Sequence, residues 1–427
     1  MRASDAGCGA PNEGPGGAEA RRVELEFLLE TASQLHAYGT PAHRLERVLV
    51  QMADHLGHTM AVFSTPTSIM LAFGAGVDQR PHLMRVEPGD VNLGKLVEFD
   101  ELLEDVEARR VDVPSALAAL RALSTAPERY GVGWSVLAFG LASATAARFF
   151  GGGLVEVLAS LALGVVIGVL GRYSQREPGV ASIFEPISGF LAAFAGLALR
   201  RAGVEVDDRI VALAGIIVLV PGLTLTVALI ELATRHLASG TARLAGASAV
   251  FLTIGLGAAL GRFVGERVLG ITAATGEAAP GEPFGWLTDW TQWLALAVAP
   301  LAFVVLFRAR RQEVGVIFAT GVIGFLAARI ASSASNDPAV GSFLGALVVG
   351  LLANLYARRV DRPATVPMLP GILMLVPGSL GYRALDAFVS HNALRGVETA
   401  FLMLLVAISL VGGLLTANAV LPPRRVL

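Results

Sequence analysis

The sequence predicts an α-helical polytopic membrane protein with about ten transmembrane helices in two related halves, preceded by a small soluble α+β domain. Hydrophobic residues make up 54% of the 427 residues, charged residues only 16%, and the mean hydropathy is +0.63, well outside the composition of soluble proteins. Residues 1–131 hold 19 acidic and 12 basic side chains, whereas the remainder has a net charge of +5. This step in charge marks a domain boundary near residue 131. Two apolar segments, one in each half, share a Val-Pro-Gly interruption, which indicates an internal repeat.

The first 21 residues are rich in glycine and proline and are predicted to be a disordered leader. They contain no apolar stretch of the kind that a secretory signal requires, so we expect the domain that follows to stay in the cytoplasm. The single cysteine, Cys8, lies in this leader and excludes a disulfide within the chain.

Residues 22–131 are predicted to form the soluble domain. Apolar residues at helical spacing predict a helix from Arg22 to about Gly39. Thr40 is expected to cap a second helix, with Pro41 at its first position. The remaining elements expected are two short strands within 58–73, a strand over 82–86, and helices over about 93–108 and 114–123.

Ten apolar segments follow, and a bilayer core needs about 20 residues for each helix that crosses it. They cover about 132–150, 154–171, 183–199, 209–230, 244–262, 290–307, 314–332, 339–357, 365–385 and 398–420. They divide into a first membrane half over 132–270, an external loop over 271–289 and a second half over 290–427. Whether the third segment spans fully is left open, as is the symmetry that relates the halves.

Loop charges predict the topology. The 271–289 loop has acidic residues but no lysine or arginine, while arginines gather in the loops on the other side. The positive-inside rule then places the soluble domain and both termini in the cytoplasm. Arg200, Arg201 and Arg209 are an exception, because their link would face outward. A basic membrane half of this kind fits arginine-flanked helices and not nucleic-acid binding.

The two Val-Pro-Gly segments match at eight of fifteen positions, in GIIVLVPGLTLTVAL from Gly215 and GILMLVPGSLGYRAL from Gly371. Proline removes a backbone donor, so each segment is predicted to be a discontinuous helix with free backbone groups near bilayer depth. Paired broken helices line substrate sites in transporters. The alternative is that both are ordinary proline-kinked packing helices.

Four motifs make the chain resemble the threonine/serine exporter family of bacterial transporters, in its fused two-half form. They are GTPAHRLERVL from Gly39, VFSTPTSIMLAF from Val62, LVPGLTLTVALIELATRHLASGTARLAGA from Leu219 and PATVPMLPGILMLVPGSLGYRAL from Pro363. The resemblance covers about residues 22–420. It implies ten membrane helices, a multi-pass location in the bacterial plasma membrane, and export of threonine and serine by proton-coupled antiport. The expected partners are the small amino acid, protons and the lipid bilayer, without cofactor or metal; homo-oligomer formation is left open.

A zwitterionic substrate needs partners for its carboxylate and its ammonium, and a hydroxy amino acid needs a third for its hydroxyl. The N-termini of half-helices can hold the carboxylate. The residues expected to bind substrate are Pro221, Gly222, Thr224, Thr226, Pro377, Gly378, Ser379 and Tyr382. For any one hydroxyl, a hydrogen bond within its own helix is the alternative.

Glu231 is the acid expected to carry the proton or to bind the ammonium, because an ionisable side chain in a membrane segment is a functional candidate. Its alternative role is an interfacial ion pair with Arg235, four residues later. Asp337 and Glu398 are rival carboxylates, one in an apparent exposed turn and the other opening the last span. Arg235, Arg243 and Arg383 are the candidate charge partners.

The soluble domain holds five of the seven histidines, which suggests an alternative function as a membrane-anchored enzyme. These histidines are His36, His43, His55, His58 and His82. They form no zinc signature, and the chain has neither a Walker phosphate loop nor a nucleophile elbow, so an enzymatic role is not expected. A non-transporting membrane sensor or assembly scaffold is the third class of function considered.

Overall fold

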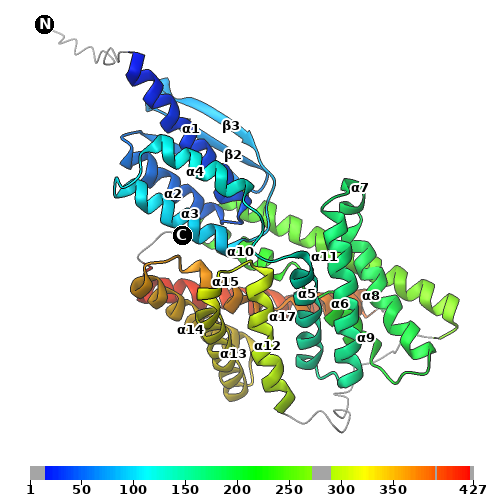
Figure 1. The fold of residues 1–427 in the computed structure, drawn as a ribbon. Helices are drawn as coiled ribbons and strands as arrows, with labels where there is room; N and C mark the ends of the chain where they lie inside the picture. The colour runs from blue at the N-terminus through cyan, green and yellow to red at the C-terminus, as the bar shows by residue number, and fades with distance from the viewer. Residues whose placement is uncertain (1–14, 272–289, 390–391, 424–427) are drawn as a thin grey trace, which may run out of the picture.

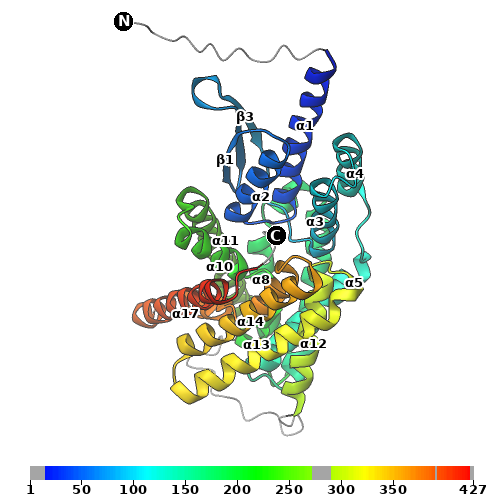
Figure 2. The same ribbon diagram turned by 90° about the vertical axis from the view of Figure 1, so that its left-hand side faces the viewer.

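The computed structural model describes residues 15–271, 290–389 and 392–423. A front domain of helices and one small sheet lies on one end of a larger helical body (Figures 1 and 2). We call the end of the body that meets the front domain the near side, and the opposite end the far side. The predicted external loop over 271–289 falls almost entirely outside the described residues.

The front domain contains four helices and a three-stranded antiparallel sheet in the order β1-β2-β3. Its elements are α1 (Pro15–Ala37), α2 (Ala42–His55), β1 (Met60–Thr65), β2 (Ser68–Phe73), the short helix η1 (Gly76–Asp78), β3 (Arg80–Arg85), α3 (Leu93–Glu107) and α4 (Val113–Thr125). The predicted leader over 1–21 is therefore wrong for residues 15–21, which form the first turns of α1. The alanines, Glu19 and the arginines of this stretch favour helix, and Pro15 is tolerated in a first turn.

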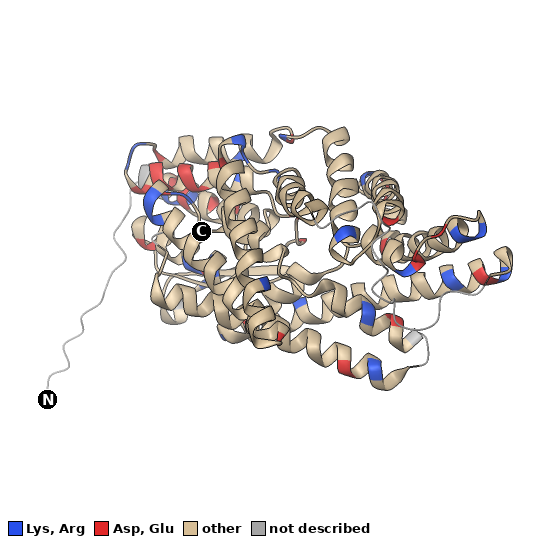
Figure 3. Ribbon diagram, turned by 90° about the horizontal axis from the view of Figure 1, so that it is seen from below, with Lys and Arg blue, Asp and Glu red and all other residues tan. Residues whose placement is uncertain are grey.

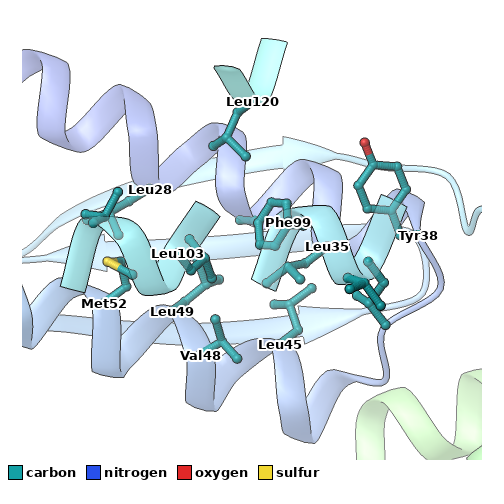
Figure 4. Packing of buried hydrophobic residues seen from close by; sticks show 14 of the residues in the cluster. Leu28, Leu35, Tyr38, Leu45, Val48, Leu49, Met52, Phe99, Leu103 and Leu120 are labelled. Carbon is teal, nitrogen blue, oxygen red and sulfur yellow. The ribbon is translucent and has the colours of Figure 1, made fainter. Parts of the chain in front are cut away.

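A single apolar core fills the front domain (Figure 4) and continues into the membrane body. Phe27, Leu45 and Phe99 are completely buried in it. The same cluster includes Phe307 and Leu369, which belong to near-side segments of the helical body. The front domain is therefore packed on the body and is not joined to it only by a linker.

Polar contacts reinforce this junction. The backbone N–H of Leu93 donates to the carbonyl of Phe307 at 2.9 Å, and the Tyr130 hydroxyl donates to the carbonyl of Ala309 at 3.0 Å. Arg310 binds both carboxylate oxygens of Glu101, at 2.7 and 2.8 Å. A two-pronged arginine–carboxylate pair fixes orientation as well as distance.

The helical body begins at α5 (Val132–Phe149). It continues with α6 (Leu154–Ser174), α7 (Pro178–Ala181), α8 (Phe184–Arg201), α9 (Asp208–Gly215), α10 (Gly222–Ala233), α11 (Leu237–Leu269), α12 (Trp290–Leu306), η2 (Arg311–Glu313), α13 (Val314–Ser335), α14 (Pro338–Val360), α15 (Thr365–Leu373), α16 (Gly378–Val389) and α17 (Ala393–Val420). Charged residues concentrate on the front domain and near helix ends, and long stretches of the helices carry none (Figure 3). This distribution is typical of helices that face lipid.

Among the residues that the structure describes, seven helical segments are long and apolar enough to cross a membrane. They are 132–149, 154–174, 237–269, 311–335, 338–360, 365–388 and 393–420. The three other predicted spans coincide with α8, with the α9–α10 pair, and with α12, of which α10 and α12 are shorter apolar helices. The protein is thus a polytopic helical membrane protein, and the count of ten spans stays a prediction.

The arginines that break the positive-inside pattern have local partners. Arg200 lies 3.1 Å from Asp208, between the end of α8 and the start of α9, and Arg201 donates to the carbonyl of Leu269 at 3.1 Å.

Glycines allow α8 and α11 to approach closely. A methyl group on Gly257 of α11 would lie 2.0 Å from the carbonyl oxygen of Pro186, and one on Gly261 would lie 2.3 Å from that of Phe190. Membrane helices have no hydrophobic drive to associate with one another, so close backbone packing by small residues is a main source of their attraction.

We therefore expect Gly257→Ala to lower the thermal stability of the detergent-solubilised protein. The added methyl group meets backbone and not a movable side chain, and overpacking of this kind costs about 1–3 kcal/mol. The matched control is Gly246→Ala on the same helix, where the new methyl group meets nothing within 4 Å. Equal melting temperatures for the two variants would contradict the close-packing account.

Candidate functional site

Both Val-Pro-Gly segments are discontinuous helices, as their sequences predict. In the first half, α9 ends at Gly215 and α10 begins at Gly222 after an irregular stretch; in the second, α15 ends at Leu373 and α16 begins at Gly378. Pro221 and Pro377 immediately precede the two new helices. The hydroxyl of Ser143 on α5, a residue that sequence reasoning did not single out, donates to the carbonyl of Gly215 at 3.2 Å and so satisfies one group that the first break exposes.

The two breaks lie against each other. A methyl group on Gly222 would stand 2.1 Å from Cγ1 of Val376, and one on Gly378 would stand 2.8 Å from Cγ1 of Val220. The same hypothetical atom on Gly222 lies 3.7 Å from the Cα atom of Gly378. Segments that are 156 positions apart in the sequence therefore place their helix N-termini at one point inside the body.

The hydroxyl residues near the breaks behave differently from one another. Thr226 is buried and donates to the carbonyl of Gly222 at 3.0 Å, within its own helix. Thr224 is exposed and Ser379 is partly buried. Of the three, Thr224 and Ser379 are therefore the better placed to meet a substrate hydroxyl.

Tyr382 and Arg383, two further residues expected near the second break, lie in different surroundings. Tyr382 is buried within an apolar cluster formed mainly by first-half helices. Arg383 is exposed, and its guanidinium lies 5.9 Å from the ring centre of Phe150. The two neighbours thus face opposite sides of α16, one toward the protein interior and one toward its surface.

Glu231 lies at the near side, in the last turn of α10 and beneath the front domain (Figures 1 and 2). Its side chain is 0% exposed and receives three hydrogen bonds. The backbone N–H of Ala42 and Nε of Arg243 donate to one carboxylate oxygen at 2.9 and 3.1 Å, and the Ser239 hydroxyl donates to the other at 2.7 Å. We call this group, Glu231 with Ala42, Ser239 and Arg243, the Glu231 centre.

The Glu231 centre corrects two predictions. Arg235 does not pair with Glu231, because α10 ends at Ala233 and Arg235 occupies a left-handed turn with φ of 67°, where it is exposed. Thr40 does not cap α2: Pro41 stands at the cap position, and the Thr40 hydroxyl has no hydrogen-bond partner in the described part of the chain. The buried carboxylate of Glu231 takes the place of the cap at the helix N-terminus, which favours negative charge.

Two histidines border the Glu231 centre. The ring of His43 on α2 lies 6.0 Å from that of His236, and His236 Nε2 is 3.3 Å from a carboxylate oxygen of Glu46. Burial, with smaller contributions from Arg44 and His236, lowers the pKa of His43 to about 3, so its ring is neutral at physiological pH. Burial also raises the pKa of Glu46 above its ordinary value.

The other histidines with defined contacts have structural partners in the front domain. His36 Nε2 is 3.0 Å from the carbonyl of Pro66, and His58 pairs with Glu24 at 2.7 Å. Within the described ranges, no three His, Cys, Asp or Glu side chains gather in a way that could hold a metal ion.

The rival carboxylates occupy exposed positions. Asp337 caps α14, accepting a hydrogen bond from the backbone N–H of Ala339 at 2.8 Å. Glu398 is exposed in the second turn of α17. Neither is surrounded by donors as Glu231 is, so the geometry favours Glu231 among the three.

Sequence reasoning missed further acidic residues inside the body, among them Glu156 and Glu313, which are more deeply buried than Asp386. Asp386 on α16 pairs with Arg262 on α11, on the far side. The signal that could have found it is its position: Asp386 follows Gly378 by eight residues, and Glu231 follows Gly222 by nine.

Comparison with known proteins agrees with this architecture. The model of the threonine/serine exporter family matches residues 26–264, and a second model, described as "Threonine/Serine exporter, ThrE", matches residues 292–420. No solved structure matches significantly.

The curated relatives are fungal membrane proteins. Pheromone-regulated membrane protein 10 of Candida albicans is 25% identical over 383 residues, covering 88% of this chain and 34% of the relative. The protein of the same name from Eremothecium gossypii is 24% identical over 366 residues, covering 84% and 48%. An uncharacterized protein of Schizosaccharomyces pombe is 23% identical over 367 residues, covering 83% and 47%. The chain thus spans half or less of the length of these relatives. The two family models together cover the front domain, both breaks and the Glu231 centre, and the chain belongs to the threonine/serine exporter family.

Proposed function

We propose that this protein is a secondary-active transporter that exports threonine and serine and is driven by the proton motive force. Family membership and the polytopic helical body support a membrane transporter. The observation that carries the proposal further is the contact between the two Val-Pro-Gly breaks, because it brings the N-termini of α10 and α16 together inside the membrane body.

The helix N-termini and C-termini that flank the two breaks suit a zwitterionic amino acid. The N-termini of α10 and α16 present unpaired backbone N–H groups and the positive ends of helix dipoles, which favour a carboxylate. The C-termini of α9 and α15 present carbonyl oxygens and negative dipole ends, which favour an ammonium group. Thr224 and Ser379 lie in the first turns of α10 and α16, where they can bond the substrate hydroxyl.

Glu231 is assigned to the proton and not to the substrate ammonium. It follows Gly222 by nine residues, and at 1.5 Å rise per residue this corresponds to about 14 Å along α10. A threonine molecule held at the breaks cannot reach that far. Protonation of Glu231 would remove the charge that holds Arg243 and the N-terminus of α2, and would thereby loosen α10 from both α11 and the front domain.

The test is efflux of labelled threonine from proteoliposomes that contain the purified protein, with and without an imposed pH gradient. We expect efflux that depends on the gradient, disappears when a protonophore collapses it, and is competed by serine. Protein-free liposomes give the leak rate. Absence of flux above that leak, from protein shown to be inserted and folded, would reject the proposal.

A further inference from the structure

The pair of Arg262 and Asp386 resembles the Glu231 centre in its construction. Arg262 Nη2 donates to Asp386 Oδ1, and the two side chains are only 19% and 24% exposed. An ion pair with this little solvent contact costs desolvation energy that a purely structural helix contact could avoid, so a conformational role is a reasonable hypothesis for it.

The two carboxylates occupy equivalent places in the two halves. Each lies eight or nine residues after the glycine that restarts a broken helix, and each pairs with an arginine of α11, Arg243 or Arg262. The two arginines are 19 residues apart, which corresponds to about 28 Å along a straight helix. The helix α11 therefore binds α10 at the near side and α16 at the far side.

Contacts along α16 strengthen its closure against α11. A methyl group on Gly381 would lie 2.5 Å from the ring of Phe251, and one on Gly255 would lie 3.2 Å from Cδ1 of Leu385. Arg262, with its ion pair to Asp386, lies at the far-side end of this row of contacts. The α16 segment thus lies against α11 from just after the break to the pair of Arg262 and Asp386.

We propose that the pair of Arg262 and Asp386 is the far-side gate of the transport path. While the pair is closed, α16 stays against α11 and the substrate-binding breaks are shut off from the far side. The Glu231 centre closes the near side in the same way, and transport alternates by opening one pair while the other stays closed. This inference rests on the proposed function, because a gate presupposes a path.

The experiment measures access to the second break from the far side. The only native cysteine is removed by Cys8→Ser, and a reporter thiol is introduced by Ser379→Cys. A membrane-impermeant thiol reagent is added to the far side of proteoliposomes. We expect slow labelling with the pair intact and at least about tenfold faster labelling with Asp386→Asn, with Arg262→Gln, or with both changes together.

The matched control is Asp337→Asn, a neutralised carboxylate at a far-side helix end, where asparagine caps as well as aspartate. We expect this control to label as slowly as the parent. The three pair variants also test one another, since a gate held by one ion pair predicts that the double change labels no faster than either single change.

The labelling result tests the gate independently of the identity of the transported substrate. Unchanged labelling in all three pair variants, each shown to be monodisperse, would overturn the gate whatever the flux assay gives. Faster labelling in the pair variants, together with no threonine flux by the protein that keeps Ser379, would support the gate and reject the proposed substrate. Faster labelling in the Asp337→Asn control as well would attribute the effect to lost surface charge and would also overturn the gate.

Discussion

Glu231→Gln should abolish gradient-driven threonine efflux while threonine exchange at equal pH on both sides continues. Glutamine has the shape of the carboxylate, so its carbonyl oxygen can still accept from the N–H of Ala42 while its NH2 group donates to the Ser239 hydroxyl. It cannot bind or release a proton, however, so the step that depends on the gradient is lost. We expect the gradient-driven rate to fall to the rate of protein-free liposomes.

The matched control for this variant is Glu398→Gln, because Glu398 is a carboxylate of the membrane body that lies exposed. It should keep both exchange and gradient-driven efflux. The Glu231→Gln variant leaves Arg243 without its carboxylate partner, so equal expression and a single size-exclusion peak are required before the rates are compared. Full gradient-driven efflux in folded Glu231→Gln protein would remove the proton role from this residue.

Ala42→Pro is expected to release the front domain from α10. Ala42 is the first residue of α2, where proline is well tolerated, and Pro41 before it already has φ of −62° and ψ of 149°, the conformation that a following proline requires. The change therefore removes one N–H group and leaves the helix intact. That group donates to the buried carboxylate of Glu231, and hydrogen bonds to charged groups contribute about 1.5–3 kcal/mol.

Hydrogen exchange measures this release directly. Peptides that cover the start of α2 and the end of α10 should exchange roughly 10- to 100-fold faster in Ala42→Pro, and gradient-driven efflux should fall with them. Ala42→Gly is the matched control, because it keeps the N–H group while also changing the side chain. If the two variants exchange equally fast, the hydrogen bond from Ala42 does not hold the front domain in place.

Local signals in the sequence predicted most of the elements. The strands around Thr65 and the helices of the front domain follow from apolar periodicity and turn residues, and the two helix breaks follow from Val-Pro-Gly. These features depend on residues that are close together in the chain, and this is why sequence reasoning reaches them.

The same reasoning could not predict contacts between residues that are far apart in the sequence. Helical spacing favoured Arg235 as the partner of Glu231, but the helix ends before that residue, and the turn that follows brings Arg243 back instead. Ala42 and Glu231 are 189 residues apart, and Arg262 and Asp386 are 124 apart. The prediction that Thr40 caps α2 was wrong because the carboxylate of Glu231, from a distant part of the chain, accepts a hydrogen bond from the N-terminus of α2 instead.

The continuous core between the front domain and the helical body has a consequence for biosynthesis. The front domain leaves the ribosome first, yet part of the surface against which it packs, including Phe307 and Leu369, is made only after residue 300. At 5–20 residues per second, the interval between residues 131 and 369 is roughly 10–50 s. During that time the newborn domain lacks part of the surface that covers its apolar face, and a chaperone or the insertion machinery must shield this face until those segments are made.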